Sequence, residues 1–143
     1  MKKIEIILGV DRNFLTPLKT LINSILLNNS NNFISINIMH NDFTDSDIEE
    51  LEEIFNKYSN YVLNFYIISN KLFKMLPTHQ HFKISTYFRI LAPNVLKESK
   101  KILYLDTDMI VDGDLAELWD IDITDYSLAA VREESAWADK RLG

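Results

Sequence analysis

The sequence contains no cysteine, only three glycines and three prolines, and no apolar run long enough to cross a membrane. The absence of cysteine excludes disulfides, cysteine nucleophiles and thiolate metal sites. Because so little glycine and proline accompanies 47% hydrophobic residues, a disordered or fibrous chain is also excluded. A membrane-spanning helix requires roughly 20 apolar residues, and Glu5 interrupts the first short apolar run. We therefore expect a cytoplasmic protein without a transmembrane segment.

The length of 143 residues suits a single domain, residues 1–143, built around one core. The net charge of −6 argues against nucleic acid as a partner, because binding to phosphates requires a surplus of lysine and arginine. The charges are unevenly distributed. Residues 54–97 contain no acidic residue, and residues 102–131 contain no lysine or arginine. A metal–diphosphate ligand would need both regions, although two ordinary solvated faces would give the same pattern.

The hydrophobic pattern alternates between strands and helices along the first half of the chain. We expect strands over residues 3–8, 34–38 and 61–68, separated by two amphipathic helices. This order is typical of right-handed crossover connections. The sequence therefore predicts an α/β fold with a mostly parallel sheet flanked by helices.

Capping residues predict where the helices begin. We expect the first helix to start with Thr16 as its N-cap and the second to start at Thr44 or Ser46. A third helix is expected over residues 84–91, ending before Pro93, because proline disfavours a continuing helix.

Asp106 and Asp108 stand one residue apart at the end of an apolar strand expected over residues 101–108. In an extended strand, alternate side chains leave by the same face, so both carboxylates would share a side. Paired hard oxygen ligands suit Mg²⁺ or Mn²⁺. Aspartate is also common in turns, so a solvated strand end remains open from the spacing alone.

The loop at Asp11 also follows a predicted strand. Ligands of parallel sheets bind beyond the carboxyl ends of the strands. We therefore expect the Asp11 loop and the pair formed by Asp106 and Asp108 to meet at one edge of the sheet.

Three segments, taken in order, resemble a family of enzymes. They are Asp11-x-Asn13, Ser85-Thr86-Tyr87-Phe88-Arg89 and Leu103-Tyr104-Leu105-Asp106-Thr107-Asp108, and Asp112-Gly113-Asp114-Leu115-x-x-Leu118-Trp119 fits the usual continuation. The chain resembles retaining glycosyltransferases of family 8, the group of glycogenin and of bacterial lipopolysaccharide galactosyl- and glucosyltransferases. The resemblance implies a Rossmann-like, nucleotide-sugar-binding fold of the GT-A type. It also implies transfer of a hexose from UDP-glucose or UDP-galactose to a glycan or lipopolysaccharide acceptor.

The resemblance also implies roles for individual residues. The nucleoside would contact Val10, Asp11 and Asn13, and the diphosphate or sugar would contact Arg89. Asp106 and Asp108 would bind Mn²⁺, with Mg²⁺ as the alternative. Thr107 would contribute mainly backbone atoms. Two further assignments have competing interpretations. His81 would lie on the substrate side or be an ordinary surface residue, and Glu133 would face the transferred sugar as a catalytic candidate or belong to a solvated charge run with Glu134.

The family continues well beyond residue 143, with acceptor-binding residues and a histidine metal ligand that do not occur here. From this we expect a C-terminally truncated fold, weak metal binding, little turnover, and an apolar surface open to self-association. Peripheral attachment to the inner membrane would depend on the missing residues. Two other functions stay open: a non-catalytic UDP-binding remnant, and a haloacid-dehalogenase-type phosphatase, which also places Asp-x-Asp after a strand.

Overall fold

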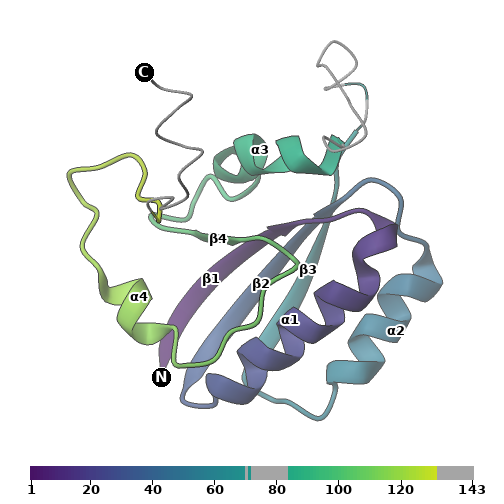
Figure 1. Ribbon diagram of the computed structural model, residues 1–143, viewed down its shortest axis with the longest axis horizontal. Coiled ribbons are helices and arrows are strands. Elements are labelled where there is room, and N and C mark those ends of the chain that lie inside the picture. The colour runs from purple at the N-terminus through teal and green to yellow at the C-terminus, as the bar shows by residue number, and fades with distance from the viewer. Residues whose placement is uncertain (70, 72–83, 132–143) are drawn as a thin grey trace, which may run out of the picture.

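A parallel sheet of four strands, in the order β3-β2-β1-β4, forms the centre of the computed structural model, which describes residues 1–69, 71 and 84–131 (Figure 1). The strands are β1 (Lys2–Gly9), β2 (Asn32–His40), β3 (Tyr61–Ile67) and β4 (Leu103–Leu105). The helices are α1 (Leu15–Asn28), α2 (Asp45–Phe55), α3 (Phe88–Val95) and α4 (Ala116–Asp120). The predicted α/β class with a parallel sheet is confirmed. None of the described helices combines the length and the apolarity needed to cross a membrane.

Side chains of β1 alternate between two apolar clusters, as the period of a strand requires. Ile4, Ile6 and Leu8 are fully buried in a large cluster that includes the apolar faces of α1 and α2. Ile7 belongs to a smaller cluster on the opposite face, where it packs with Phe88 of α3. Figure 1 shows α1 and α2 side by side over one face of the sheet, with α3 apart from them.

The first helix begins earlier than predicted, and Thr16 is not its N-cap. A 3₁₀ turn, Arg12–Phe14, comes first, and Asp11 caps it by accepting a hydrogen bond from the backbone N–H of Asn13. The helix then starts at Leu15, directly from that turn. Because Asp11 already supplies the capping carboxylate, the chain turns four residues before the threonine that the sequence favoured.

The second helix begins as predicted at Thr44. Its hydroxyl accepts a hydrogen bond from the backbone N–H of Asp47, and the Asp47 side chain accepts one from the backbone N–H of Thr44. This reciprocal arrangement is a capping box, and it satisfies two backbone donors that the helix would otherwise leave unpaired.

The prediction that the third helix ends before Pro93 is wrong. A 3₁₀ helix, Ile84–Tyr87, leads into α3, which contains Pro93 and ends at Val95. Proline removes one backbone donor, but Leu96 still donates to the carbonyl of Ala92 at 3.2 Å, so the last turn closes around it. As a result, Arg89 lies in the first turn of α3.

Candidate functional site

The carboxyl ends of β1 and β4 lie next to each other. Leu8 of β1 pairs with Leu105 of β4 in the parallel ladder. The Asp11 loop and the Asp106 turn therefore leave the sheet from neighbouring strands at the same edge. This is the juxtaposition that the sequence predicts.

The start of α3 packs directly on the end of β1. A Cβ atom added to Gly9 would lie 2.9 Å from the Cβ of Phe88, 3.0 Å from the hydroxyl of Tyr104 and 3.3 Å from the carbonyl oxygen of Ser85. Such contacts are too short for a real side chain, so glycine is required here for close approach. Gly9 therefore brings β1, β4 and the Ser85–Arg89 region together.

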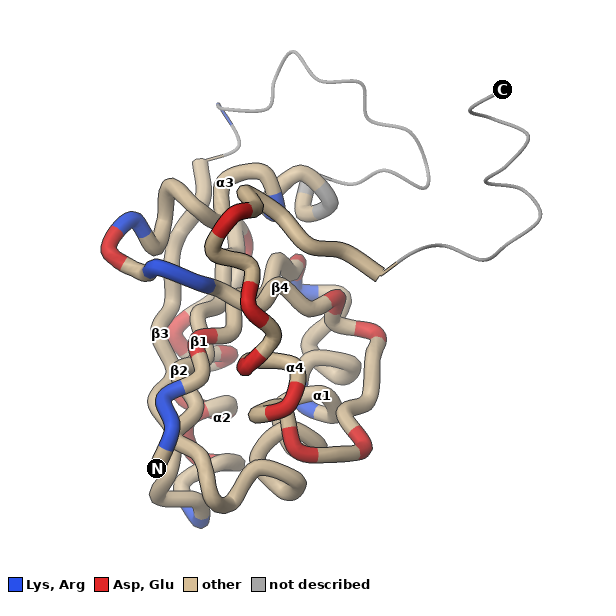
Figure 2. Tube along the Cα trace, turned by 90° about the vertical axis from the view of Figure 1, so that its left-hand side faces the viewer, with Lys and Arg blue, Asp and Glu red and all other residues tan. Residues whose placement is uncertain are grey.

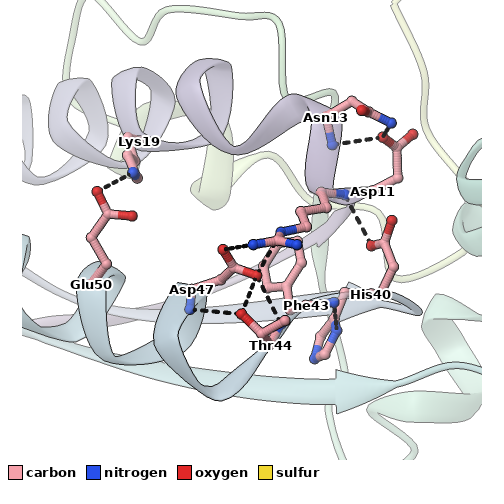
Figure 3. Close-up of polar contacts among 10 residues, drawn as sticks. Asp11, Asn13, Lys19, His40, Phe43, Thr44, Asp47 and Glu50 are labelled. Atoms are coloured by element: carbon pink, nitrogen blue, oxygen red, sulfur yellow. Dashed lines mark hydrogen bonds and ion pairs between the residues drawn. The ribbon is translucent and has the colours of Figure 1, made fainter.

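Asp11 links its own loop to the Ser85 segment. Its Oδ1 accepts hydrogen bonds from the backbone N–H and the side-chain amide of Asn13, both at 3.0 Å (Figure 3). Its Oδ2 accepts one from the hydroxyl of Ser85 at 3.2 Å. Asp11 is only 8% exposed, whereas Asn13 is exposed. A nearly buried carboxylate thus orients an exposed amide beside the ends of two strands.

Arg89 contacts Asp106 across this edge. Its Nη2 donates to Oδ1 of Asp106 at 2.8 Å, and its guanidinium carbon lies 5.2 Å from the centre of the Tyr104 ring. Burial raises the pKa of Tyr104, and the charge of Arg89 opposes that shift. The phenol therefore stays neutral at physiological pH and provides an apolar surface beneath the guanidinium.

The two aspartates do not lie on an extended strand, contrary to the prediction. β4 ends at Leu105, and Thr107 and Asp108 form part of a turn. Their exposure nevertheless alternates: Thr107 is buried, whereas Asp106 and Asp108 are exposed. The predicted role of the Thr107 backbone stays a prediction.

Asp106 and Asp108 provide two hard oxygen donors suited to Mn²⁺ or Mg²⁺. Across residues 1–69, 71 and 84–131, no group of three or more histidine, aspartate or glutamate side chains is placed to hold a metal ion. A pair of carboxylates fits a cation that takes its remaining ligands from water and substrate phosphate, which is the usual arrangement for Mg²⁺.

Acidic residues recur along the segment that follows β4, as Figure 2 shows, but several have structural partners. Asp114 accepts hydrogen bonds from the side chain of Asn32 and the backbone N–H of Ala116, both at 2.8 Å. Asp122 accepts hydrogen bonds from the hydroxyl of Thr124 at 2.6 Å and from its backbone N–H at 2.9 Å, and these bonds lower the pKa of Asp122. The acidic run is therefore partly explained by local structure.

The side chain of Val10 is 1% exposed and lies in the core, and its backbone N–H donates to the carbonyl of Met39 at 3.0 Å. Only the remaining backbone atoms of Val10 are thus suited to contact a nucleoside. His81 and Glu133 lie outside the described residues, and their roles stay predictions.

Sequence reasoning gave no role to Gly9, Ser85 or Tyr104, although all three shape the site. Gly9 is one of only three glycines and directly follows a predicted strand, which is a signal for close backbone approach. Ser85 precedes Arg89 by four residues, a spacing that places two side chains on one face of a helix. Tyr104 carried no signal of its own.

Comparisons with known proteins agree on one family. The model of the family described as glycosyl transferase family 8 matches residues 5–142. The chain is 33% identical to the glycosyltransferase GlyF of Streptococcus pneumoniae serotype 4 over 139 residues, which is 97% of this chain and 34% of that protein. It is 30% identical to the lipopolysaccharide 1,3-galactosyltransferase of Salmonella typhimurium over 142 residues, which is 97% of this chain and 42% of that protein.

Solved structures agree on the fold. The galactosyltransferase LgtC, crystallised with donor and acceptor sugar analogs, is 22% identical with a TM-score of 0.76, covering 85% of this chain and 44% of LgtC. The bifunctional glycosyltransferase WbbM is 26% identical with a TM-score of 0.72, covering 87% of this chain and 22% of WbbM. The fold is therefore of the GT-A type. The chain spans about a third to two fifths of the length of the curated relatives described above.

Proposed function

Because this chain belongs to glycosyl transferase family 8, we propose that it forms the donor-binding part of an enzyme that transfers a hexose from a UDP-sugar to a glycan, with retention of anomeric configuration and with a divalent cation. The observation that carries this proposal is the meeting of three segments at one edge of the sheet. Ser85 contacts Asp11 at 3.2 Å, and Arg89 contacts Asp106 at 2.8 Å.

We assign the nucleoside to the Asp11 loop. An ionised aspartate only accepts hydrogen bonds, whereas an asparagine amide both donates and accepts them. Ribose hydroxyls and the uracil ring present both kinds of group. Because Asp11 already holds Asn13 in place, the amide needs little reordering when it meets a nucleoside, which lowers the entropic cost of binding.

We assign the diphosphate to Arg89 and the cation to Asp106 and Asp108. Breaking the bond from the anomeric carbon to the phosphate leaves negative charge on the departing UDP. A bound Mn²⁺ or Mg²⁺ supplies Lewis-acid stabilisation of that charge. Arg89 offers a fixed planar cation whose N–H groups match phosphate oxygens, and its position over Tyr104 limits its freedom.

The donor and acceptor belong to the same proposal. UDP-glucose and UDP-galactose are the proposed donors, and a bacterial surface glycan such as lipopolysaccharide is the proposed acceptor. The support is that relatives of this chain are named lipopolysaccharide 1,3-galactosyltransferase and lipopolysaccharide 1,2-glucosyltransferase. The family match also favours this function over the phosphatase alternative.

A titration of UDP by calorimetry, with Mn²⁺ and then with a chelator, tests the proposal. We expect binding that depends on the metal, and we expect UDP with Mn²⁺ to raise the melting temperature, since a ligand that binds only the folded chain stabilises it. Hydrolysis of UDP-glucose or UDP-galactose is the second readout. UDP binding without any turnover would support the non-catalytic alternative, and no binding of UDP would contradict the proposal.

A further inference from the structure

Arg12 connects the loop after β1 to the start of α2. Its Nε lies 2.9 Å from Oδ2 of Asp47, and its Nη2 donates to Oδ1 of the same carboxylate at 3.2 Å. The contact is thus bidentate, a geometry available to arginine but not to lysine. The Asp47 side chain is 9% exposed, whereas that of Arg12 is 54% exposed.

Asp47 is itself held firmly. Its Oδ2 accepts hydrogen bonds from the backbone N–H of Thr44 at 2.8 Å and from the Thr44 hydroxyl at 2.7 Å (Figure 3). These bonds, followed by the Arg12 guanidinium, hold the pKa of Asp47 below its usual range, so it is ionised at neutral pH. The carboxylate therefore presents a fixed charge to Arg12.

The backbone of Arg12 is held as well. Its N–H donates to Oδ1 of Asp42 at 2.9 Å, in the loop that follows β2. Arg12 stands between Asp11 and Asn13, the two residues assigned to the nucleoside. Its side chain contacts the start of α2, while Asp11 contacts Ser85 on the other side. The loop after β1 is thus tied to two other segments.

We infer that Arg12, through Asp47, is a positioning residue for the nucleoside site: it fixes the backbone from which Asp11 and Asn13 project. This inference rests on the proposed function, because it concerns the same donor. The Arg12–Asp47 pair does not itself contact the nucleotide. It acts by keeping both neighbours in a binding-ready arrangement before the donor arrives, so that less conformational entropy is lost on binding.

The test compares Arg12→Gln, Arg12→Lys and Asp47→Asn with the unaltered chain in a calorimetric titration of UDP with Mn²⁺. We expect Arg12→Gln to weaken UDP binding about tenfold, which corresponds to about 1.4 kcal/mol. Arg12→Lys should weaken UDP binding less than Arg12→Gln does, because lysine keeps the charge and loses only the bidentate contact. The double variant Arg12→Gln/Asp47→Asn should bind no more weakly than the worse single variant, since each change already removes the Arg12–Asp47 ion pair.

A second ion pair provides the matched control. Lys19 of α1 lies 2.6 Å from Glu50 of α2, so this pair also contacts α2 but does not involve the loop (Figure 3). Lys19→Gln should leave UDP affinity within about twofold, as expected for an exposed pair. A change of affinity in Arg12→Gln alone would therefore report on the loop and not on the general loss of an ion pair with α2.

Hydrogen exchange gives a readout that needs no nucleotide. The backbone N–H of Asn13, which donates to Asp11, should exchange faster in Arg12→Gln and be unchanged in Lys19→Gln. If the unaltered chain binds UDP and Arg12→Gln binds it equally well, the inference is wrong while the proposed function stands. If the single effects add fully in the double variant, the inference is also wrong. If the unaltered chain binds no UDP, both fail together.

Discussion

The guanidinium of Arg89 lies 2.8 Å from the carboxylate of Asp106, so the side chain that we assign to the diphosphate contacts a side chain that we assign to the metal. Both side chains are about half exposed. Arg89 and a divalent cation would therefore compete for Asp106 until a diphosphate offers Arg89 another partner. Nucleotide and metal are then expected to favour each other's binding.

Arg89→Gln tests this competition. Two unit charges about 4 Å apart in water interact by about 1 kcal/mol, so removing the guanidinium should strengthen binding of Mn²⁺ alone by about fivefold. The same variant should weaken binding of UDP with Mn²⁺. Both affinities are measured by calorimetry. Lys3→Gln is the control for net charge, because Lys3 contacts Glu5 in the first half of β1. Equal changes in both variants would mean that Arg89 does not compete for Asp106.

Gly9→Ala should destabilise the chain because the added Cβ would lie 2.9 Å from the Cβ of Phe88. Overpacking of this kind costs typically about 1–3 kcal/mol of unfolding free energy. Gly113→Ala is the matched control, since a Cβ there would meet no atom of the described residues within 4 Å. Urea unfolding of both variants measures the difference. A Gly9→Ala chain as stable as the Gly113→Ala chain would show that α3 does not pack on β1 as described.

Thr44→Ala should lower the unfolding free energy by about 1 kcal/mol, since it removes the N-cap of α2. Ser46, the other cap candidate in the sequence, lies within the first turn and is exposed. Ser46→Ala should therefore change stability by no more than about 0.5 kcal/mol. Urea unfolding followed by circular dichroism compares the two. Equal losses would contradict the observed position of the cap.

His40 should make stability depend on pH. It is 2% exposed and stacked on Phe43, and burial lowers its pKa, partly opposed by Asp42. In the unfolded chain a histidine takes up a proton near pH 6.5. The unfolded state then binds more protons than the folded state, so stability is fully present above about pH 6.5 and is lost as the pH falls below it.

His40→Asn removes that titration. Its unfolding free energy should fall less steeply between pH 7 and pH 5 than that of the unaltered chain, even if asparagine lowers stability at pH 7 by losing the contact with Phe43. Chemical unfolding at several pH values measures both slopes. Identical slopes would mean that His40 is not the group responsible.

Strong periodicity and capping residues allowed much of the fold to be predicted. Ile34, Ile36 and Ile38 alternate in the sequence and are fully buried on one face of β2, and Thr44 caps α2 as expected. Thr16 failed as a cap because Asp11, five residues earlier, already starts a turn. Local preference predicts an element when no neighbouring residue competes for the same backbone donors.

The candidate site was predictable only in part. The rule that ligands of parallel sheets bind at the carboxyl ends of the strands correctly predicted that the Asp11 loop and the Asp106 turn leave the same edge of the sheet. The contacts of Ser85 with Asp11 and of Arg12 with Asp47 join residues that are 74 and 35 positions apart. No periodicity reports such long-range pairs, because they depend on how the helices pack on the sheet.

The most direct test of the account is a calorimetric titration of UDP into Asp106→Asn and Asp112→Asn, each with and without Mn²⁺. Both variants lose one exposed carboxylate from the same acidic segment, but only Asp106 is assigned to the metal. We predict that Asp106→Asn abolishes the effect of Mn²⁺ on UDP binding and that Asp112→Asn preserves it. An unchanged effect of Mn²⁺ in Asp106→Asn would contradict the metal-assisted donor site at the centre of this account.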